Sequence, residues 1–475
     1  MATNNPSLQQ LQQRVDADLN ALHLPAHRWI LHHPGDYSLL DVAVIGGGMA
    51  GMAVGFGLMK EGVCRVEIFD DNPRGEEGPW ETSARMDYLR SSKTMPGPAM
   101  GIASLTFQSW YQAVYGETAW EQLDLVPTAD WAAYLRWYRE ATHLPIRNEM
   151  VLQEIRPVGS NLELMFDHLG SPVIVYAHKV VLATGRKGFG GVLLPPYADQ
   201  IPKNFCAHTA DRIDTALFPN KTIVVVGAGA SAFDAAGTAL EYGAKEVHML
   251  IRRDQIPIVN RFARFSFAGI LHGFYSLSDQ ARFDFFREAF CCGIPPSVAS
   301  VERVSAHDNI YLHFSTQIET IDLMPDNVIL NAQKENISAD FIIFATGYTI
   351  EPSMRPEFYH FIDAILLWED RIPRWLLAKQ PKLGRFPYLG GHFQFLEKKE
   401  GIAPELKNIY CFNYGAFLSH GLVSGDIPGL SVGATRLVEG IVSDLFTEDY
   451  KQYLQMIRNY STPLFSPEDY KIFRD

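Results

Sequence analysis

The chain has 475 residues, of which 41 are Lys or Arg and 54 are Asp or Glu, so that its formal net charge at pH 7 is -13. This acidic balance disfavours nucleic acid and anionic membranes as partners, because both are bound through a basic face, and we expect a small-molecule substrate. Hydrophobic residues make up 47% of the chain, as in globular proteins, and the five scattered cysteines include no C-x-x-C pair. The cysteine pattern indicates a reducing, cytoplasmic compartment and predicts no metal site.

The first 40 residues lack the basic and apolar regions of a signal peptide and predict a helical extension. Residues 42–59 are all apolar or glycine, which is long enough to suggest a membrane span. Their glycine spacing instead predicts a buried strand that runs into a buried helix.

A dinucleotide-binding fingerprint occupies this strand–turn–helix segment. It has the form G-x-G-x-x-G, with Gly46, Gly48, Met49, Ala50 and Gly51 at the turn and the helix start. Such glycines allow a sharp turn and a close approach of the backbone to a pyrophosphate. Asp70 closes the second strand 24 positions after Gly46, where a carboxylate binds a ribose hydroxyl, and Asp71 competes for that role. The alternative is a glycine-rich turn that binds nothing.

The same strand–turn–helix–strand pattern recurs in KTIVVVGAGASAFDAAGTALEYGAKEVHMLIRRD. The predicted binding residues of this second turn are Gly227, Gly229, Ala230, Ser231 and Ala232. Arg252 and Arg253 stand at the end of its second strand, where an acidic residue would favour NAD. Their guanidinium groups suit the 2′-phosphate of NADP, so that NADPH is expected in preference to NADH; the alternative is solvated surface charge.

Two apolar strands that carry ATG at their ends, at 179–185 and 339–348, frame the second unit. Their order predicts an α/β protein with two doubly wound Rossmann-like domains, one inserted into the other, plus helical insertions. The predicted segments are an N-terminal extension (1–40), the first part of a discontinuous dinucleotide domain (41–219), an inserted nicotinamide domain with a helical insertion (220–338), and the second part of the outer domain (339–475), with an aromatic-rich insertion at 352–407.

This order resembles the two-dinucleotide flavoproteins, and in particular the class B flavin-containing and N-hydroxylating monooxygenases. The resemblance implies FAD at the first turn and NADPH at the second. Disulfide reductases of the same group are disfavoured, because their redox-active cysteine pair is missing and the adjacent Cys291 and Cys292 cannot replace it.

In the resembling families, a stretch like GPWETSARMDYLRSSKTMPGP lies beside the flavin. By position, Trp80 and Met86 inherit flavin-binding roles, Lys93 a place beside the ring, and Arg85, like Arg90, a place in the cofactor pocket. The resemblance makes Lys93 and Arg85 candidate catalytic residues. The alternatives are core packing for Trp80 and surface charge for Lys93. The monooxygenase fingerprint F-x-G-x-x-x-H is degraded here and keeps only its histidine, His208, which is a candidate catalytic residue; the alternative is a structural histidine in a loop.

A later stretch, NIYCFNYGAFLSHGLVSGDIPGLSVGATRLVEGI, resembles the part of N-hydroxylases that carries an asparagine, then H-G-L, then an arginine on a helix. The matching residues are Asn413, His420, Gly421, Leu422 and Arg436. Asp426 fits a different register, in which an aspartate binds the ribityl chain, and the two registers stay open. In either register a helix is expected to start near Ile427 and to point its N-terminus at the flavin.

The resemblance implies an NADPH-dependent flavoprotein monooxygenase that uses O2 and hydroxylates a small nitrogenous or aromatic substrate through a C4a-(hydro)peroxyflavin. The alternatives are a reductase or oxidase that inserts no oxygen, and a flavin-binding sensor without turnover. Two aromatic insertions could wall the substrate, although such stripes are more often core or oligomer interface. Association into a homo-oligomer is expected from resemblance alone.

Overall fold

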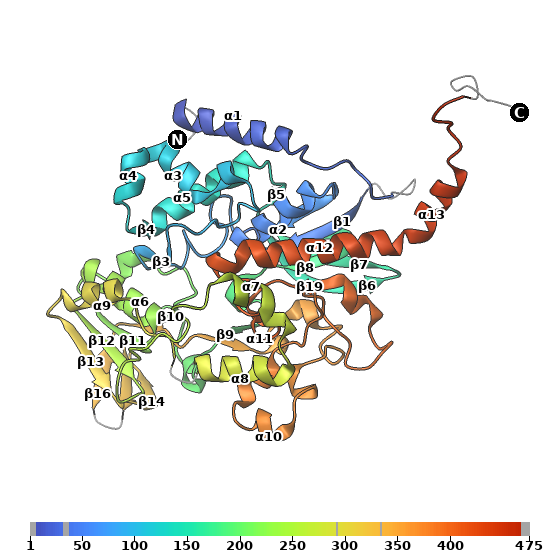
Figure 1. Ribbon diagram of the computed structural model, residues 1–475. Helices are drawn as coiled ribbons and strands as arrows, with labels where there is room; N and C mark the ends of the chain where they lie inside the picture. The colour runs from blue at the N-terminus through green and yellow to red at the C-terminus, as the bar shows by residue number, and fades with distance from the viewer. Residues whose placement is uncertain (1–5, 32–37, 291–292, 333–334, 467–475) are drawn as a thin grey trace, which may run out of the picture.

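The computed structural model of the protein describes residues 6–31, 38–290, 293–332 and 335–466. Two largely parallel sheets, each with helices packed on it, dominate the chain (Figure 1). The predicted α/β class with two Rossmann-like units is confirmed. In the described part of the chain, no helix is long and apolar enough to cross a membrane.

The first sheet forms around β1, a strand that pairs in parallel with β2 on one side and β8 on the other. Its strands are β5 (Ile146–Arg147), β2 (Val66–Phe69), β1 (Leu39–Ile45), β8 (Ser171–Leu182), β7 (Asn161–His168) and β6 (Met150–Val158), in this spatial order, with β19 (Ile409–Cys411) paired to the end of β8. The centre of β1 is fully buried, which explains why the residues there are apolar without alternating polar positions.

The second sheet is parallel throughout. Its spatial order is β10 (Cys206–His208), β17 (Phe341–Phe344), β11 (Thr222–Val226), β12 (Glu246–Ile251) and β13 (Ile310–Phe314). A smaller antiparallel sheet lies beside it, made of β14 (Ile318–Leu323), β15 (Val328–Ala332) and β16 (Asn336–Ala339). The buried residues of these strands, together with those of two helices, α6 (Ala230–Glu241) and α9 (Val298–Ser305), form cores separate from that of the first sheet.

The chain crosses between the two sheets through short strands. On the way out it forms β9 (Gly190–Val192), and on the way back β18 (Tyr348–Ile350), which pairs with β9 antiparallel. A further antiparallel pair, β3 (Tyr88–Ser92) and β4 (Leu125–Pro127), lies at the side of the first sheet.

Helices from distant parts of the chain share the first core. Those around the first sheet are α1 (Pro6–Ala21), α2 (Met49–Lys60), α3 (Phe107–Tyr115), α4 (Glu117–Gln122), α5 (Thr128–Ala141), α11 (Phe417–His420) and α12 (Leu430–Glu448), and α13 (Tyr450–Asn459) projects from the body (Figure 1). Two helices from the middle of the chain, α7 (Ala268–Gly273) and α8 (Asp279–Phe290), pack into this same core, although they lie within the stretch predicted as the nicotinamide domain. Most aromatic residues of both insertions therefore lie in or against this core, as their helical spacing predicts. The insertion after β18 also contains α10 (Arg374–Leu377).

Candidate cofactor and active site

The first glycine turn lies between β1 and α2, at the carboxyl end of the first sheet. Gly46 has a φ of +105°, and a Cβ on it would lie 2.5 Å from the carbonyl oxygen of Ala183. A Cβ on Gly51 would lie 1.8 Å from the carbonyl oxygen of Gly46. Because both distances are far inside contact, only glycine allows α2 to begin this close to the strands.

The N-terminus of α2 is open. Its N-cap residue, Gly48, has no side chain that could accept hydrogen bonds from the first N–H groups of the helix, which include those of Met49 and Ala50. Gly78 lies opposite, and a Cβ on Gly48 would be 3.5 Å from the Cα of Gly78. Two stretches of backbone without side chains thus flank a helix N-terminus, which suits a bound pyrophosphate.

Asp70 lies buried at the end of β2, next to this turn. Its carboxylate accepts hydrogen bonds from the backbone N–H groups of Gly47 (2.6 Å) and Asn72 (2.8 Å). Burial raises the pKa of Asp70 to about 6, with these hydrogen bonds acting in the opposite direction. Asp71 is exposed and bonds the side chain of Asn72. Of the two predicted candidates, Asp70 is the one that touches the glycine turn.

A buried ion pair holds the loop that follows Asp70. The guanidinium of Arg139 bonds the carboxylate of Glu77, and the two side chains are 9% and 3% exposed. Arg139 also donates to the side-chain oxygen of Asn148 (3.0 Å) and the carbonyl oxygen of Ile146 (2.9 Å). No sequence pattern indicates this pair, because its two residues lie 62 positions apart and neither belongs to a motif.

Trp80 and Met86, which were predicted to bind the flavin, both lie partly buried against the first core. Trp80 packs edge-on against Trp131, with ring centroids 6.2 Å apart. Among the described residues, nothing accepts a hydrogen bond from the buried indole Nε1 of Trp80. Such an unmet donor costs about 1–3 kcal/mol, which an acceptor atom on a bound cofactor would offset.

Arg85 and Arg90 lie where the segment after Trp80 meets the nicotinamide-binding unit. Arg85 donates to the carbonyl oxygens of Thr209 (2.8 Å) and Asp211 (2.7 Å), and burial lowers the pKa of its guanidinium. Arg90 forms an ion pair with Asp234 of α6 at 2.6 Å. Both arginines therefore join the two units, and a direct contact with a cofactor stays a prediction.

Arg303 of α9 adds to this boundary, although no sequence pattern singled it out. It donates to the carbonyl oxygen of Arg85 (2.7 Å) and pairs with Glu241 and Asp87.

Lys93 directly follows β3, and its side chain lies beside the C-terminal end of α4. Its ammonium group donates to the carbonyl oxygens of Trp120 (2.7 Å) and Leu123 (2.5 Å) and lies 5.0 Å from the centroid of the Trp120 ring. The structure thus gives Lys93 the role of satisfying the last carbonyl groups of a helix. Its predicted place beside the flavin ring remains a prediction.

The second glycine turn repeats the first. Gly227 has a φ of +146°, and a Cβ on it would lie 2.5 Å from the carbonyl oxygen of Ala345. Gly229 is the N-cap of α6 and has no capping side chain, so the N–H groups of Ala230 and Ser231 face an open helix end. Ala232 is fully buried, as the close-packing position of the fingerprint requires.

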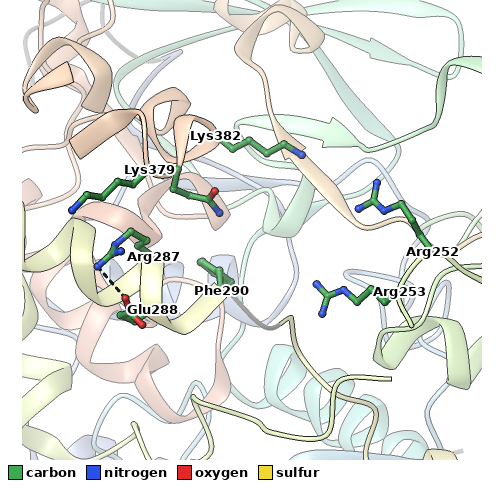
Figure 2. Close-up of a pocket in the computed structure, with 8 residues that line it drawn as sticks. Arg252, Arg253, Arg287, Glu288, Phe290, Lys379 and Lys382 are labelled. Atoms are coloured by element: carbon green, nitrogen blue, oxygen red, sulfur yellow. Dashed lines mark ion pairs between the residues drawn. The ribbon is translucent and has the colours of Figure 1, made fainter. Parts of the chain in front are cut away.

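Arg252 and Arg253, at the end of β12, line a cavity of about 540 Å³ (Figure 2). The other lining residues are Arg287, Glu288, Phe290, Lys379, Gln380 and Lys382. The two arginines lie on one side of the cavity, whereas the other labelled side chains lie on the opposite side.

His208 ends β10 at the crossing between the two units. Its Nδ1 accepts a hydrogen bond from the backbone N–H of Ala210 (3.0 Å), and its Nε2 is buried without a partner among the described residues. Burial lowers the pKa of His208 from 6.5 to about 4, although nearby Asp211 acts in the opposite direction. The imidazole is therefore neutral at pH 7, and whether it acts in catalysis stays a prediction.

We expect His208 to make stability depend on pH. The unfolded chain takes up this proton near pH 6.5, whereas the folded protein resists it down to about pH 4. The contribution of His208 is therefore complete above pH 6.5 and is lost toward pH 4, by about 1.4 kcal/mol per pH unit. The free energy of unfolding, measured with urea at several pH values between 6.5 and 4, should depend less steeply on pH for His208→Asn than for the unchanged protein. The asparagine keeps an acceptor for Ala210. The same pH dependence in both proteins would contradict the assignment.

Asn413 joins the carboxyl ends of β19 and β8. Its amide nitrogen donates to the carbonyl oxygen of Leu182 (3.0 Å), and its side-chain oxygen accepts from the N–H of Gly415 (2.9 Å). The side chain is fully buried. His420 is fully buried as well, and its Nε2 lies 2.9 Å from the carbonyl oxygen of Gly390.

The imidazole of His420 stacks on Phe393, at a centroid distance of 3.8 Å, and on Tyr275, at 4.7 Å. Burial lowers the pKa of His420 well below its usual value. Arg436 of α12 lies 3.4 Å from its Nδ1. The structure thus surrounds the predicted histidine with protein groups.

After His420 the chain turns at Gly421, with a φ of +78°, and passes Leu422, which packs partly buried on the first core. Asp426 follows, 3.9 Å from Arg186 and with its side chain 33% exposed. The helix expected near Ile427 begins as a 3-10 turn and becomes α12 at Leu430. Asp426 therefore keeps a partly exposed carboxylate just before this helix, whereas Asn413 and His420 are bonded to protein groups.

Together, the two open helix ends, the unmet donor of Trp80 and the acidic residue beside the first turn fit FAD and a nicotinamide dinucleotide. No cluster that could hold a metal occurs in the described residues. The fold and the site define a two-dinucleotide flavoprotein.

Comparison with known proteins extends this conclusion. Residues 43–187 match the FAD-NAD(P)-binding family, and residues 120–350 match the L-lysine 6-monooxygenase/L-ornithine 5-monooxygenase family. The chain is 33% identical to an FAD-dependent urate hydroxylase of Xanthomonas campestris pv. campestris over 463 residues, which is 97% of each chain. The chain therefore belongs to the class B flavin monooxygenase family and is an FAD-dependent hydroxylase that also binds NAD(P)H.

Solved structures show the same fold at low sequence identity. The ornithine hydroxylase PvdA of Pseudomonas aeruginosa superimposes with a TM-score of 0.67 at 15% identity, covering 86% of this chain and all of the other. The ornithine N-hydroxylase KtzI of Kutzneria sp. 744 gives 0.65 at 14% identity, covering 86% of this chain and 99% of the other.

Proposed function

We propose that the protein hydroxylates a small nitrogen-containing ring compound, with urate as the first candidate, at the expense of NADPH and O2. The observation that carries the use of FAD and a nicotinamide dinucleotide is the pair of open glycine turns, each built against the carbonyl group of an ATG strand, Ala183 or Ala345. The relative that is 33% identical is described as a urate hydroxylase, which supports urate over the amino acids of the more distant relatives.

The residues of the first turn would hold FAD. The N-terminus of α2 and the gap between Gly48 and Gly78 would receive its pyrophosphate, Asp70 a ribose hydroxyl, and Trp80 Nε1 would donate to one of its acceptor atoms. When bound and reduced, the flavin supplies the electrons that activate O2 for transfer of one oxygen atom to the substrate.

The protein's own contribution is a dry, fixed setting for this chemistry. Asp70 and the Arg139–Glu77 pair position the cofactor loop. Arg85, Arg90 and Arg303 keep the segment after Trp80 against the nicotinamide-binding unit. Closing off water in this way favours oxygen transfer over release of hydrogen peroxide.

The choice of NADPH rests on Arg252 and Arg253. Both are exposed at the strand end where the 2′-substituent of the adenosine ribose is expected, and they line a cavity that is open to solvent. A guanidinium fork matches a phosphate and has no equivalent partner on the 2′-hydroxyl of NADH.

The test is incorporation of oxygen from ¹⁸O2. With urate and NADPH, we expect the product to carry ¹⁸O and NADPH oxidation to accelerate on addition of urate, and we expect ornithine and lysine to have no such effect. If hydrogen peroxide accounts for all the NADPH consumed in the presence of urate and of other purines, the proposed substrate class is wrong.

A further inference from the structure

The basic cavity next to Arg252 and Arg253 is built from parts of the chain that are far apart in sequence. Arg287 comes from α8, and Lys379 and Lys382 come from the insertion that follows β18. Figure 2 shows the amino group of Lys382 directed across the cavity toward the side of Arg252. The cavity therefore spans the junction between the nicotinamide-binding unit and the 352–407 insertion.

The charge of this cavity is strongly positive. Five of its lining residues are basic and one, Glu288, is acidic. Glu288 is already paired with Arg287 (2.9 Å) and Arg261 (3.3 Å). With five basic residues and one acidic residue, the lining of the cavity carries a net positive charge, which would attract an anionic ligand.

The cavity also adjoins the second glycine turn. A Cβ on Gly293 would lie 3.1 Å from the guanidinium of Arg253, and a Cβ on Gly229 would lie 3.8 Å from the carbonyl oxygen of Ile294. Gly293 and Ile294, which are adjacent in the chain, thus lie between the guanidinium of Arg253 and Gly229, the N-cap of α6. A nucleotide whose pyrophosphate lies at that helix end can place its adenosine in the cavity, and the volume of about 540 Å³ falls in the usual range of about 300–1,000 Å³ for ligand pockets.

We propose that Lys379 and Lys382 bind the 2′-phosphate of NADPH together with Arg252 and Arg253, so that the insertion is part of the nucleotide site. This inference rests on the proposed use of NADPH. A phosphate dianion held by ammonium groups from one side and guanidinium groups from the other would join the insertion to the nicotinamide-binding unit. The lysines are therefore residues that determine nucleotide specificity, contributed by a segment outside the glycine-turn unit.

The experiment uses the flavin-loaded full chain and titration calorimetry with adenosine 2′,5′-bisphosphate, with 5′-AMP as the ligand that lacks the 2′-phosphate. For Lys379→Gln/Lys382→Gln we expect about a tenfold or greater loss of affinity for the bisphosphate and none for 5′-AMP. The matched control is Lys399→Gln, an exposed lysine of the same insertion that does not line the cavity. In steady state, the KM for NADPH should rise in the lysine variant while kcat at saturation stays unchanged.

A second variant, Arg252→Gln/Arg253→Gln, separates this inference from the proposed function. If the arginine variant loses affinity for the bisphosphate and the lysine variant does not, the role of the lysines is overturned and the NADPH assignment stands. If neither variant loses affinity, both are overturned. Equal competition by inorganic phosphate and by the bisphosphate would show a general anion site, and would also overturn the inference.

Discussion

Gly51→Ala is expected to yield protein with little or no bound flavin and a large loss of stability. The added Cβ would lie 1.8 Å from the carbonyl oxygen of Gly46 and 2.9 Å from its carbonyl carbon. Both are backbone atoms of the first turn, so the strain can be relieved only by moving α2 away from the strands. We expect the free energy of unfolding to fall by more than about 4 kcal/mol, which is exceptional for a single methyl group.

Flavin absorbance per mole of protein, together with urea unfolding, measures this effect. Gly273→Ala is the control, because a Cβ there meets no heavy atom within 4 Å. Gly48→Ala separates cofactor binding from folding: its Cβ has ordinary contacts only, at 3.5 Å from Gly78, but it would occupy the space at the open helix end. A folded Gly48→Ala protein with full flavin content would contradict the assignment of the pyrophosphate site.

The second large effect is expected for Arg139→Met. This change leaves the carboxylate of Glu77 buried without its cation, and breaking one side of a buried ion pair costs about 3–5 kcal/mol. Because Glu77 also accepts a hydrogen bond from the N–H of Gly75 (3.0 Å), the loop that presents Gly78 to the helix end should loosen. We therefore expect weaker FAD binding in addition to lower stability.

Two variants make this result specific. Adding Glu77→Gln to Arg139→Met removes the unpaired charge and should restore part of the stability, because the amide keeps an acceptor for Asn148. Arg136→Met, on the same helix, breaks an exposed pair with Glu81, in which the side chains are 46% and 40% exposed, and should cost no more than about 1 kcal/mol. Equal losses for Arg136→Met and Arg139→Met would contradict the assigned role of burial.

The glycine turns could be predicted from sequence because their physics is local. Gly46, Gly48 and Gly51 lie within six residues, and the strand–turn–helix order follows from the adjoining apolar runs. The ATG strands were recognised as boundaries, but their contact with the turns was not. The structure supplies the reason for their recurrence: the carbonyl oxygens of Ala183 and Ala345 lie where a side chain on Gly46 or Gly227 would be.

Other features depend on contacts across long stretches of chain, which a pattern of residues does not specify. The spacing of the aromatic residues in α8 indicated an apolar face but not the core that it joins. Lys93 matched a family position, whereas its contacts are set by where α4 happens to end. The ion pairs Arg139–Glu77 and Arg90–Asp234 join residues with no shared motif, so only the folded chain brings them together.

The pairing of β19 with β8 also determines when the first sheet can be completed during synthesis. β8 ends at Leu182 and its partner begins at Ile409, so the 226 residues from 183 to 408 must be translated between them. At about 5–20 residues per second this takes roughly ten to forty-five seconds. Throughout that interval the strand end that carries Val180 and Val181 has an unpaired edge on the ribosome, where nascent chains can join edge to edge. The nesting of one domain in another thus leaves this edge of the first sheet open until β19 has been synthesised.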